Sequence, residues 1–490
     1  MVITWTHEQN LEMKLLITSS LLLLAGFSTL AGATDTTPTT AENTLTKNEP
    51  VYASNQDNAE NIVTKNEPVY ASNEDNAENT LTKNEPVYAS NQDNAAQNPL
   101  QMGSMAPSES PRHRQEKTHL MKRMDRKTGK WGTTHPRYRT LEALYGFTKY
   151  RERNMAELSR WRTMYGNVSK QQKKTLEKAV NYRKKLDDIE ELIYTNEVLC
   201  KAIVANAMAF YGIEQKELDE HIRDAEKANR VADRISPSQT LKHFVRDWAD
   251  EGAKERNDAF PCLLHTLSPL QANTSTSTPL KILLPGSGLG RLGTEIANLG
   301  NYAVTLNEWS MYMNTAYRYL TTLSPTSPAT FHPFIDTLSH HPTTTSLLRP
   351  IAFPNTPPNT AVLLVEGDFT TAFRGQERAF DIILTHFFID TARNLLSYFE
   401  TIHALLAPGG RWINFGPLLY GTGPFVQLSL DEIVNVVEGM GFVFEDVGEE
   451  CGGRTFVDGE VRWKEAEYGF DGEALTRNAY KAQVWSVRRL

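Results

Sequence analysis

A glycine turn after a short apolar strand is the most informative group of chemistry-bearing residues in this sequence. Residues 285–290 read PGSGLG, directly after the apolar run at 282–284 and before a segment with helical spacing. Gly286 and Gly288 allow the backbone to approach a ligand closely, and the start of a helix presents free N–H groups. Dinucleotide enzymes commonly use G-x-G-x-x-G, whereas this turn has G-x-G-x-G. The spacing therefore favours S-adenosylmethionine (SAM), which has no pyrophosphate.

Acidic residues stand where a nucleoside bound at such a turn would need them. Glu308 ends the next strand, 22 positions after Gly286, where a carboxylate can accept the ribose hydroxyls. Asp368 and Phe369 follow the third strand, where an acid can accept the adenine amino group and a ring can flank the base. Glu308 alone would be equally compatible with a surface acid at a strand end. Together with the glycine turn, it favours a ligand site.

These residues need a sheet that brings strand ends together. From residue 280 short apolar strands alternate with helical segments, and five strands are expected in KILLP, YAVTLNEWS, AVLLVEGDF, FDIILTHFFID and GGRWINFGPL. This alternation predicts an α/β fold with a parallel, doubly wound sheet that binds ligands at the carboxyl ends of its strands. We expect this Rossmann-like domain at 280–490. The stretch 324–360 holds eight prolines and is expected to be a surface insertion without a helix.

A helical region is expected before this domain, at 137–255, because apolar residues recur there at intervals of three and four. Its last helix places His243 and Arg246 on one face, a spacing more typical of a solvated pair than of a ligand site. Upstream, residues 34–136 are expected to be a disordered linker, basic towards its end. It contains three 18-residue repeats at 41–94, which have too few bulky apolar residues to form a core. Residues 1–33 resemble a signal peptide.

Composition excludes several classes of protein. The net charge of −8 argues against a nucleic-acid-binding protein, and no other stretch is apolar and long enough to span a bilayer. Cys200, Cys262 and Cys451 lie far apart without CxxC spacing, which argues against a cysteine-built zinc site and a disulfide scaffold and favours reduced thiols. His340 and His341 are adjacent without further ligands at useful spacing, so no metal site is expected. The oligomeric state is left open.

Several longer stretches resemble the carnosine N-methyltransferase family, the N2227-type proteins. They are LLPGSGLGRLGTEIA, LNEWS, GDF, FFIDTARN, LAPGGRWINFGPLLY and, upstream, LKHFVRDWADEG. The resemblance runs from about Arg137 to Leu490, and FFIDTA and WINxGPLLY are its most specific motifs. It implies a class I methyltransferase that uses SAM to methylate an imidazole nitrogen of carnosine, a small-molecule substrate, and so forms anserine.

The resemblance also implies the residues of the site. The SAM pocket would comprise His243, Arg246, Gly286, Glu308, Asp368, Phe369 and His386. The acceptor would contact Asp390 of FFIDTA and Tyr480 of NAYKAQVWSVRR. Asp390 is expected to accept a hydrogen bond from the protonated ring nitrogen of the acceptor, which fixes its tautomer and stabilises the developing positive charge. Asp390 is also a candidate cap for a helix at 391–405.

Three positions depart from the family pattern. The family usually has glutamine at the position of His243, often cysteine at that of His386, and histidine directly after GPLLY, where this chain has Gly421. The third departure leaves the acceptor open between carnosine or a related dipeptide, a protein histidine and another small molecule. A non-enzymatic secreted repeat protein is the remaining alternative. Because SAM is made in the cytosol, a cytoplasmic or nuclear location is expected, with the signal-like segment leaving secretion open.

Overall fold

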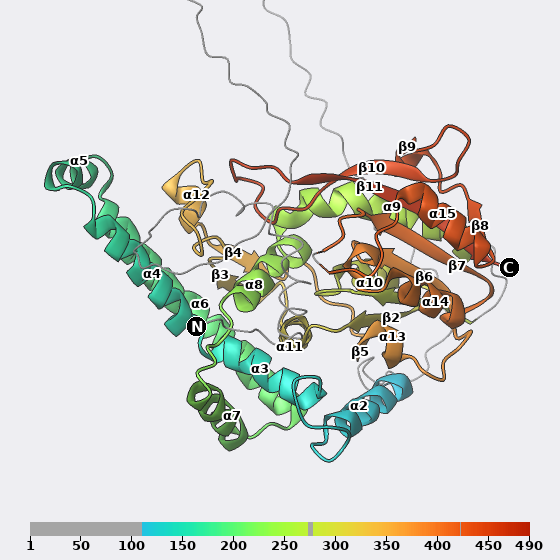
Figure 1. Ribbon diagram of the computed structural model, residues 1–490, viewed down its shortest axis with the longest axis horizontal. Helices are drawn as coiled ribbons and strands as arrows, with labels where there is room; N and C mark the ends of the chain where they lie inside the picture. The colour runs from blue at the N-terminus through green and yellow to red at the C-terminus, as the bar shows by residue number, and fades with distance from the viewer. Residues whose placement is uncertain (1–109, 273–277, 422) are drawn as a thin grey trace, which may run out of the picture. The chain divides into compact units, whose positions relative to one another are not determined.

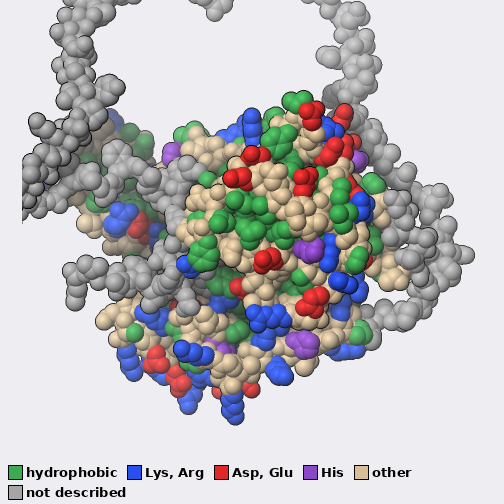
Figure 2. All heavy atoms as spheres, turned by 45° about the vertical axis from the view of Figure 1, so that its right-hand side comes forward, with side chains coloured by type: hydrophobic (Ala, Val, Ile, Leu, Met, Phe, Trp, Pro, Cys, Tyr) green, Lys and Arg blue, Asp and Glu red, His purple; other side chains and the backbone are tan. Residues whose placement is uncertain are grey.

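The computed structural model describes residues 110–272, 278–421 and 423–490. The signal-like segment at 1–33 and the repeats at 41–94 lie outside the described residues. No helix in the described part of the chain is both long enough and apolar enough to cross a bilayer. On the face drawn in Figure 2, basic and acidic side chains are interspersed.

The predicted parallel α/β sheet is confirmed, with an antiparallel extension at one side (Figure 1). The strand order is β5-β2-β1-β6-β7-β11-β10-β9, and β8 also pairs with β11. The first five are parallel neighbours, and β11 runs antiparallel to β7. The chain leaves β1 towards β2 and β5 on one side and later adds β6 and β7 on the other. Ligands bind at such a reversal point in doubly wound sheets. The strands are β1 (Leu280–Pro285), β2 (Tyr302–Glu308), β5 (Leu363–Glu366), β6 (Phe380–His386), β7 (Leu406–Gly416), β8 (Phe442–Glu445), β9 (Gly453–Arg454), β10 (Arg462–Glu467) and β11 (Ala479–Arg489).

Both faces of the sheet are covered, which explains why its central strands read as apolar runs. Ile282 and Leu284 of β1 belong to one core cluster, while Leu283 between them belongs to the other, because successive strand residues point to opposite faces. The helices that alternate with the strands are α10 (Arg291–Asn298), α11 (Met311–Leu320), α13 (Phe369–Ala372), α14 (Leu395–Leu405) and α15 (Leu430–Gly439).

Helices precede the sheet and continue to Ala272. Two of them, α4 and α6, pack side by side, and the short α5 lies at the end of this pair (Figure 1). Helix α8 packs against α3 and α11, so this region is continuous with the core of the sheet. The helices are α3 (Pro136–Thr148), α4 (Tyr150–Gly166), α5 (Lys170–Val180), α6 (Tyr182–Tyr211), α7 (Gln215–Lys227), α8 (Ile235–Trp248) and α9 (Ala253–Ala272).

The expectation that the linker extends to residue 136 is wrong at its end. Residues Pro111–Met124 form helix α2, which starts with a proline and buries Leu120 and Met124. Two of its basic residues bind the sheet: Arg112 donates to the carbonyl of Val304 at 2.8 Å, and Arg123 donates to that of Glu366 at 3.2 Å. The basic end of this stretch gave no indication of a helix, because charge alone does not reveal such backbone acceptors.

The proline-rich stretch 324–360 also differs from its expectation. It holds a two-stranded sheet of β3 (Ala329–Phe331) and β4 (Ile351–Phe353), and a short helix α12 (Thr344–Leu348). Thr343 caps that helix by accepting a hydrogen bond from the Ser346 N–H. Phe353 stacks on Phe244 of α8 with ring centroids 4.0 Å apart. Buried aromatic residues therefore anchor this segment to the core, although its prolines predicted a surface loop.

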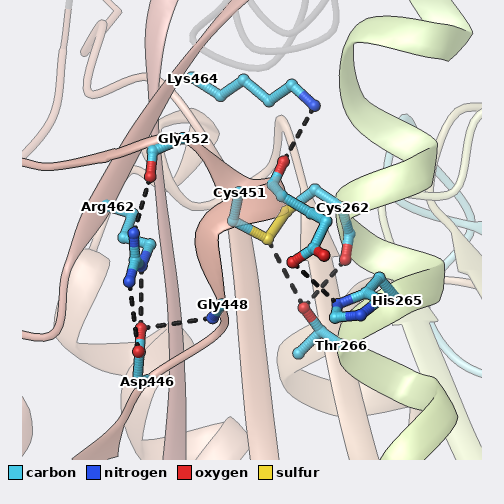
Figure 3. Close-up of a disulfide and its surroundings, with 10 residues drawn as sticks. Cys262, His265, Thr266, Asp446, Gly448, Cys451, Gly452, Arg462 and Lys464 are labelled. Atoms are coloured by element: carbon cyan, nitrogen blue, oxygen red, sulfur yellow. Dashed lines mark hydrogen bonds and ion pairs between the residues drawn. A yellow bond between two sulfur atoms is a disulfide. The ribbon is translucent and has the colours of Figure 1, made fainter.

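The expectation of reduced thiols is wrong for two of the three cysteines. Cys262 of α9 and Cys451, at the end of the 3₁₀ turn η5 (Glu449–Cys451), form a disulfide across 189 positions of sequence (Figure 3). Both are fully buried, while Cys200 is a buried free thiol. A pairing over this distance depends on the tertiary fold, so cysteine spacing could not reveal it. The disulfide fixes the middle of α9 to the segment that leads into β9 and β10.

Candidate functional site

One large cavity opens at the carboxyl ends of the parallel strands, beside the reversal point at β1. Its volume is about 460 Å³, and its walls come from the glycine turn after β1, the ends of β2 and β6, and the helices α8 and α9. The structure brings all eight sequence-predicted cofactor residues to this cavity: His243, Arg246, Gly286, Gly288, Glu308, Asp368, Phe369 and His386.

The glycine turn is shaped so that the backbone itself forms the cavity wall. Gly286 and Gly288 have backbone φ values of +64° and +55°, which residues other than glycine rarely adopt. A Cβ on Gly286 would lie 2.3 Å from Cδ2 of Phe388. That ring cannot move aside, because it stacks on Tyr398 with centroids 4.6 Å apart and meets Phe369 edge-on. Glycine is therefore required at 286 by both conformation and space.

The variant Gly286→Ala is expected to lower the free energy of unfolding by about 2–4 kcal/mol, because it combines a strained φ with a clash against a fixed ring. Gly300→Ala provides the matched control: its φ is +75°, but nothing lies within 4 Å of the added Cβ. Chemical denaturation of both variants measures the difference. Equal losses of stability would show that the Phe388 ring yields and that the space at 286 is not limiting.

Glu308 is fixed by the turn that it faces. Its two carboxylate oxygens accept hydrogen bonds from the N–H groups of Gly288 and Ser310, each at 2.8 Å. Burial raises the pKa of the carboxyl, and the backbone donors oppose that rise. The acid thus lines the cavity directly beside the glycine turn. The reading of Glu308 as a surface acid does not fit this geometry.

Helix α8 supplies a charged wall, so the expectation of a solvated pair at His243 and Arg246 is wrong. Arg246 forms a two-pronged ion pair with Asp247, with N–O distances of 2.8 and 3.3 Å. Its guanidinium lies over the ring of Tyr468 at 4.8 Å. These groups are enclosed because α9 and the loop after β10 cover this side of α8, and the ion pair keeps Arg246 charged in an enclosed site.

Two imidazoles line the cavity and have buried ring nitrogens without a protein partner. These are Nδ1 of His243 and Nε2 of His386. Burial, reinforced by the nearby Arg246, lowers the pKa of each histidine to about 3, so both rings are neutral. Buried polar atoms without a partner are costly unless a ligand or water satisfies them. Their position indicates hydrogen-bonding sites for a polar ligand in the cavity.

The predicted acceptor residues line a second, smaller cavity of about 30 Å³. Asp390 and Tyr480 both face it, and it shares Phe387, Thr391 and Tyr468 with the large cavity. The two cavities are therefore adjacent. Phe387 has a φ of +51°, a strained conformation for a large side chain. Such strain persists where the surroundings fix it, often at functional sites.

Asp390 is held by the loop that follows β7. One of its carboxylate oxygens accepts from the N–H of Leu419 at 3.0 Å. Burial raises its pKa to about 7. Its alternative role as a helix cap is wrong, because Asp390 lies in the 3₁₀ turn η4 (Ile389–Thr391) and α14 begins only at Leu395. The carboxyl is thus oriented towards the cavity by a backbone donor and titrates near neutrality.

Sequence reasoning missed Tyr468 and Asp247. Tyr468 follows β10, lines both cavities and packs on Phe387 with ring centroids 4.8 Å apart. No motif surrounds it, so only the register of β10 against β11 reveals its position. Asp247 adjoins Arg246 in sequence, and an acid next to an arginine predicted to bind the cofactor was the available signal. Over the described ranges, no three metal-ligating side chains come together.

Comparison with known proteins identifies the family of this chain. Residues 225–490 match the family model for carnosine N-methyltransferase. The carnosine N-methyltransferase of Mus musculus is 35% identical over 272 residues, which cover 53% of this chain and 67% of that protein. The chain belongs to the carnosine N-methyltransferase family. The carnosine N-methyltransferase of Schizosaccharomyces pombe is 32% identical to this chain over 288 residues, which cover 54% of this chain and 75% of that protein.

Membership of this family makes the chain a SAM-dependent methyltransferase, and the non-enzymatic alternative is not supported. A solved magnesium protoporphyrin IX methyltransferase from Synechocystis with bound SAM aligns at a TM-score of 0.28 and 12% identity, covering 49% of this chain and 83% of that one. That likeness is too distant to carry an argument. The cavity itself fits SAM, because a glycine turn that excludes a Cβ, a fixed carboxylate and two unpartnered imidazole nitrogens line it.

Proposed function

We propose that this chain transfers a methyl group to an imidazole nitrogen of carnosine or a related histidine-containing dipeptide, and that carnosine gives anserine. The observation that carries the proposal is the small cavity at Asp390 and Tyr480, which borders the large cavity suited to SAM. The names of the Mus musculus and Schizosaccharomyces pombe relatives support carnosine as the acceptor.

The position of the predicted cofactor residues in the large cavity supports a role for each of them. Glu308 would accept hydrogen bonds from the ribose hydroxyls, and Asp368 would accept one from the adenine amino group. Phe369 would flank the base. Arg246 would bind the carboxylate of the methionine moiety, and the turn at Gly286 and Gly288 would lie against the nucleoside. SAM supplies the chemistry of an electrophilic methyl group on a sulfonium.

The protein's own task in catalysis is to bind, orient and exclude water. An imidazole with a reference pKa near 6.5 is mostly neutral at pH 7, so little deprotonation is needed. Asp390 would accept a hydrogen bond from one ring N–H, which leaves the lone pair of the other nitrogen free to react. As the ring gains positive charge, the carboxylate would stabilise it. Burial raises the pKa of Tyr480, so its hydroxyl stays protonated and can donate or accept a hydrogen bond.

Glu308→Ala is expected to weaken SAM binding about 10- to 100-fold, because hydrogen bonds to a charged group contribute about 1.5–3 kcal/mol. Glu400→Ala is a suitable control, since Glu400 is an exposed acid on α14. Isothermal titration calorimetry with SAM and with its demethylated product gives the two affinities. If Glu308→Ala bound both ligands as tightly as the control, the assignment of the ribose to Glu308 would be wrong.

A second candidate acceptor is a histidine within a protein. Gly421, where the family resemblance leads us to expect a histidine, lines the large cavity and leaves that wall without a side chain. Labelled SAM offered with carnosine, free histidine and histidine-containing peptides decides between the acceptors. Methylation of carnosine at least tenfold above the peptides in kcat/KM supports the dipeptide, and the reverse order supports the protein histidine.

A further inference from the structure

The loop between β10 and β11 forms one wall of the site and is held from two sides. Its first residue, Tyr468, lines both cavities, and Phe470 packs edge-on against the ring of His243 with centroids 4.9 Å apart. On the first side, Oε1 of Glu255 on α9 accepts hydrogen bonds from the N–H groups of Gly469 and Phe470, at 3.0 and 2.5 Å. Phe470 has a φ of +65°, a strained conformation for a large side chain. Such a backbone keeps its shape only where its surroundings fix it.

The second side is the proline-rich insertion, which the proposed mechanism does not use. Arg349, between α12 and β4, donates to Oδ1 of Asp471 at 2.6 Å. Both side chains are largely enclosed, with 11% and 9% of their surface exposed. Nearby, the Leu475 N–H donates to the backbone carbonyl of His340 at 2.7 Å. The insertion thus binds the loop directly after Phe470.

Arg349 is the cation that balances Asp471 in this enclosed place. Its guanidinium lies over the ring of Phe334 at 4.1 Å, which fixes it to the insertion. His341 lies 3.8 Å from Asp471, but burial lowers the pKa of this histidine, so its ring is neutral at pH 7. Glu473 lies 3.6 Å from Arg349 and is 54% exposed, so solvent screens it. Removing one partner of an enclosed ion pair leaves the other charge unbalanced, which is costly.

We propose that the ion pair of Arg349 and Asp471 positions Tyr468 against the acceptor. This inference rests on the proposed function, because it takes the small cavity as the acceptor site. Neither residue of the pair lines either cavity, so both act through the loop and are positioning residues. Asp471 follows Tyr468 by three residues, so a shift of Asp471 displaces the wall that Tyr468 forms. A misplacement of about 1 Å in a site can cost about 100-fold in rate.

The test compares Asp471→Asn with Asp471→Glu. Asp471→Asn keeps the size of the side chain but loses its charge, and kcat/KM for carnosine is expected to fall about 10- to 100-fold. Asp471→Glu keeps the charge and is expected to recover most of this loss. The control is Asp458→Asn, at an exposed acid in the loop between β9 and β10, and it is expected to match the wild type.

Calorimetry with the demethylated product of SAM measures the cofactor site separately. Its affinity is expected to change less than about threefold in Asp471→Asn, because the glycine turn and Glu308 lie outside the loop.

Hydrogen exchange gives a readout that does not depend on activity. The amides of Gly469 and Phe470 donate to Glu255, so they are expected to exchange slowly in the wild type. In Asp471→Asn they are expected to exchange about tenfold faster, because a released loop opens locally. Mass spectrometry of a peptide that covers 468–471, compared with one from β1, separates local opening from a general loss of stability.

The outcomes separate this inference from the proposed function. Wild-type kcat/KM in Asp471→Asn, or unchanged exchange at 469 and 470, would overturn the positioning role while leaving carnosine methylation intact. The role would also be overturned by an equal rise of exchange in β1, or by a loss of cofactor affinity as large as that of kcat/KM. If the wild type binds SAM but methylates no dipeptide, the proposed function fails, and the exchange rates still decide whether the pair holds the loop.

Discussion

Asp390→Asn is expected to lower kcat about 100- to 1000-fold while the affinity for SAM stays that of the wild type. The amide keeps the size of the side chain and can still accept from the Leu419 N–H, so the loop after β7 retains its anchor. What is lost is the negative charge that would stabilise the positive imidazole ring as the methyl group arrives. Losses of this size are typical when one preorganised electrostatic partner is removed.

The pH profile provides a second readout of the same carboxyl. Burial penalises the anion and raises the pKa of Asp390 to about 7, so the ionised form is lost as pH falls through that value. The acceptor imidazole also becomes protonated near pH 6.5. The wild type should therefore lose kcat/KM with a slope of about two below pH 6, and Asp390→Asn with a slope of about one, because only the acceptor then titrates.

Steady-state kinetics with carnosine and calorimetry with SAM together measure this prediction. A residual kcat near that of the wild type, with SAM affinity unchanged, would remove Asp390 from the reaction. A slope of two that persists in Asp390→Asn would assign the second ionisation to another group.

Local patterns explain which parts of the site the sequence could predict. The glycine turn, Glu308 and Asp368 each lie at the end of an apolar strand, and parallel strands bring such ends together in any doubly wound sheet. Gly286 is recognisable because its conformation is set by residues next to it in the chain. For these positions the order of residues along the sequence fixes the arrangement in space.

Contacts between distant segments could not be predicted in this way. Tyr468 reaches both cavities through the register of β10 on β11, and Cys262 meets Cys451 only after α9 has packed beside η5. The basic residues of α2 gave no indication of order because their acceptors are backbone carbonyls of β2 and β5. In each case nothing close in the sequence indicates which residues become neighbours, so the interaction appears only with the fold.

The double variant Cys262→Ser/Cys451→Ser is expected to lower the free energy of unfolding by about 4 kcal/mol. The disulfide closes a loop of 189 positions, and a longer loop removes more conformational entropy from the unfolded chain.

The disulfide also holds one wall of the site. Its α9 cysteine lies on the helix that carries Phe260 of the large cavity, and Glu255 of that helix accepts from the Gly469 N–H at 3.0 Å, next to Tyr468. We therefore expect the variant to raise the KM for the acceptor as well.

Denaturant unfolding of the wild type and the double variant, each with and without a thiol reductant, measures the loss of stability. The variant has no disulfide to reduce, so it is the control for other effects of the reductant. Reductant should bring the stability of the wild type down to that of the variant and leave the variant unchanged, since its remaining thiol, Cys200, is unpaired. A reduced wild type that keeps its full stability would show that tertiary packing alone holds α9 against the segment at Cys451. If reductant raised the acceptor KM without lowering stability, the disulfide would act on the position of Tyr468 rather than on the unfolded chain.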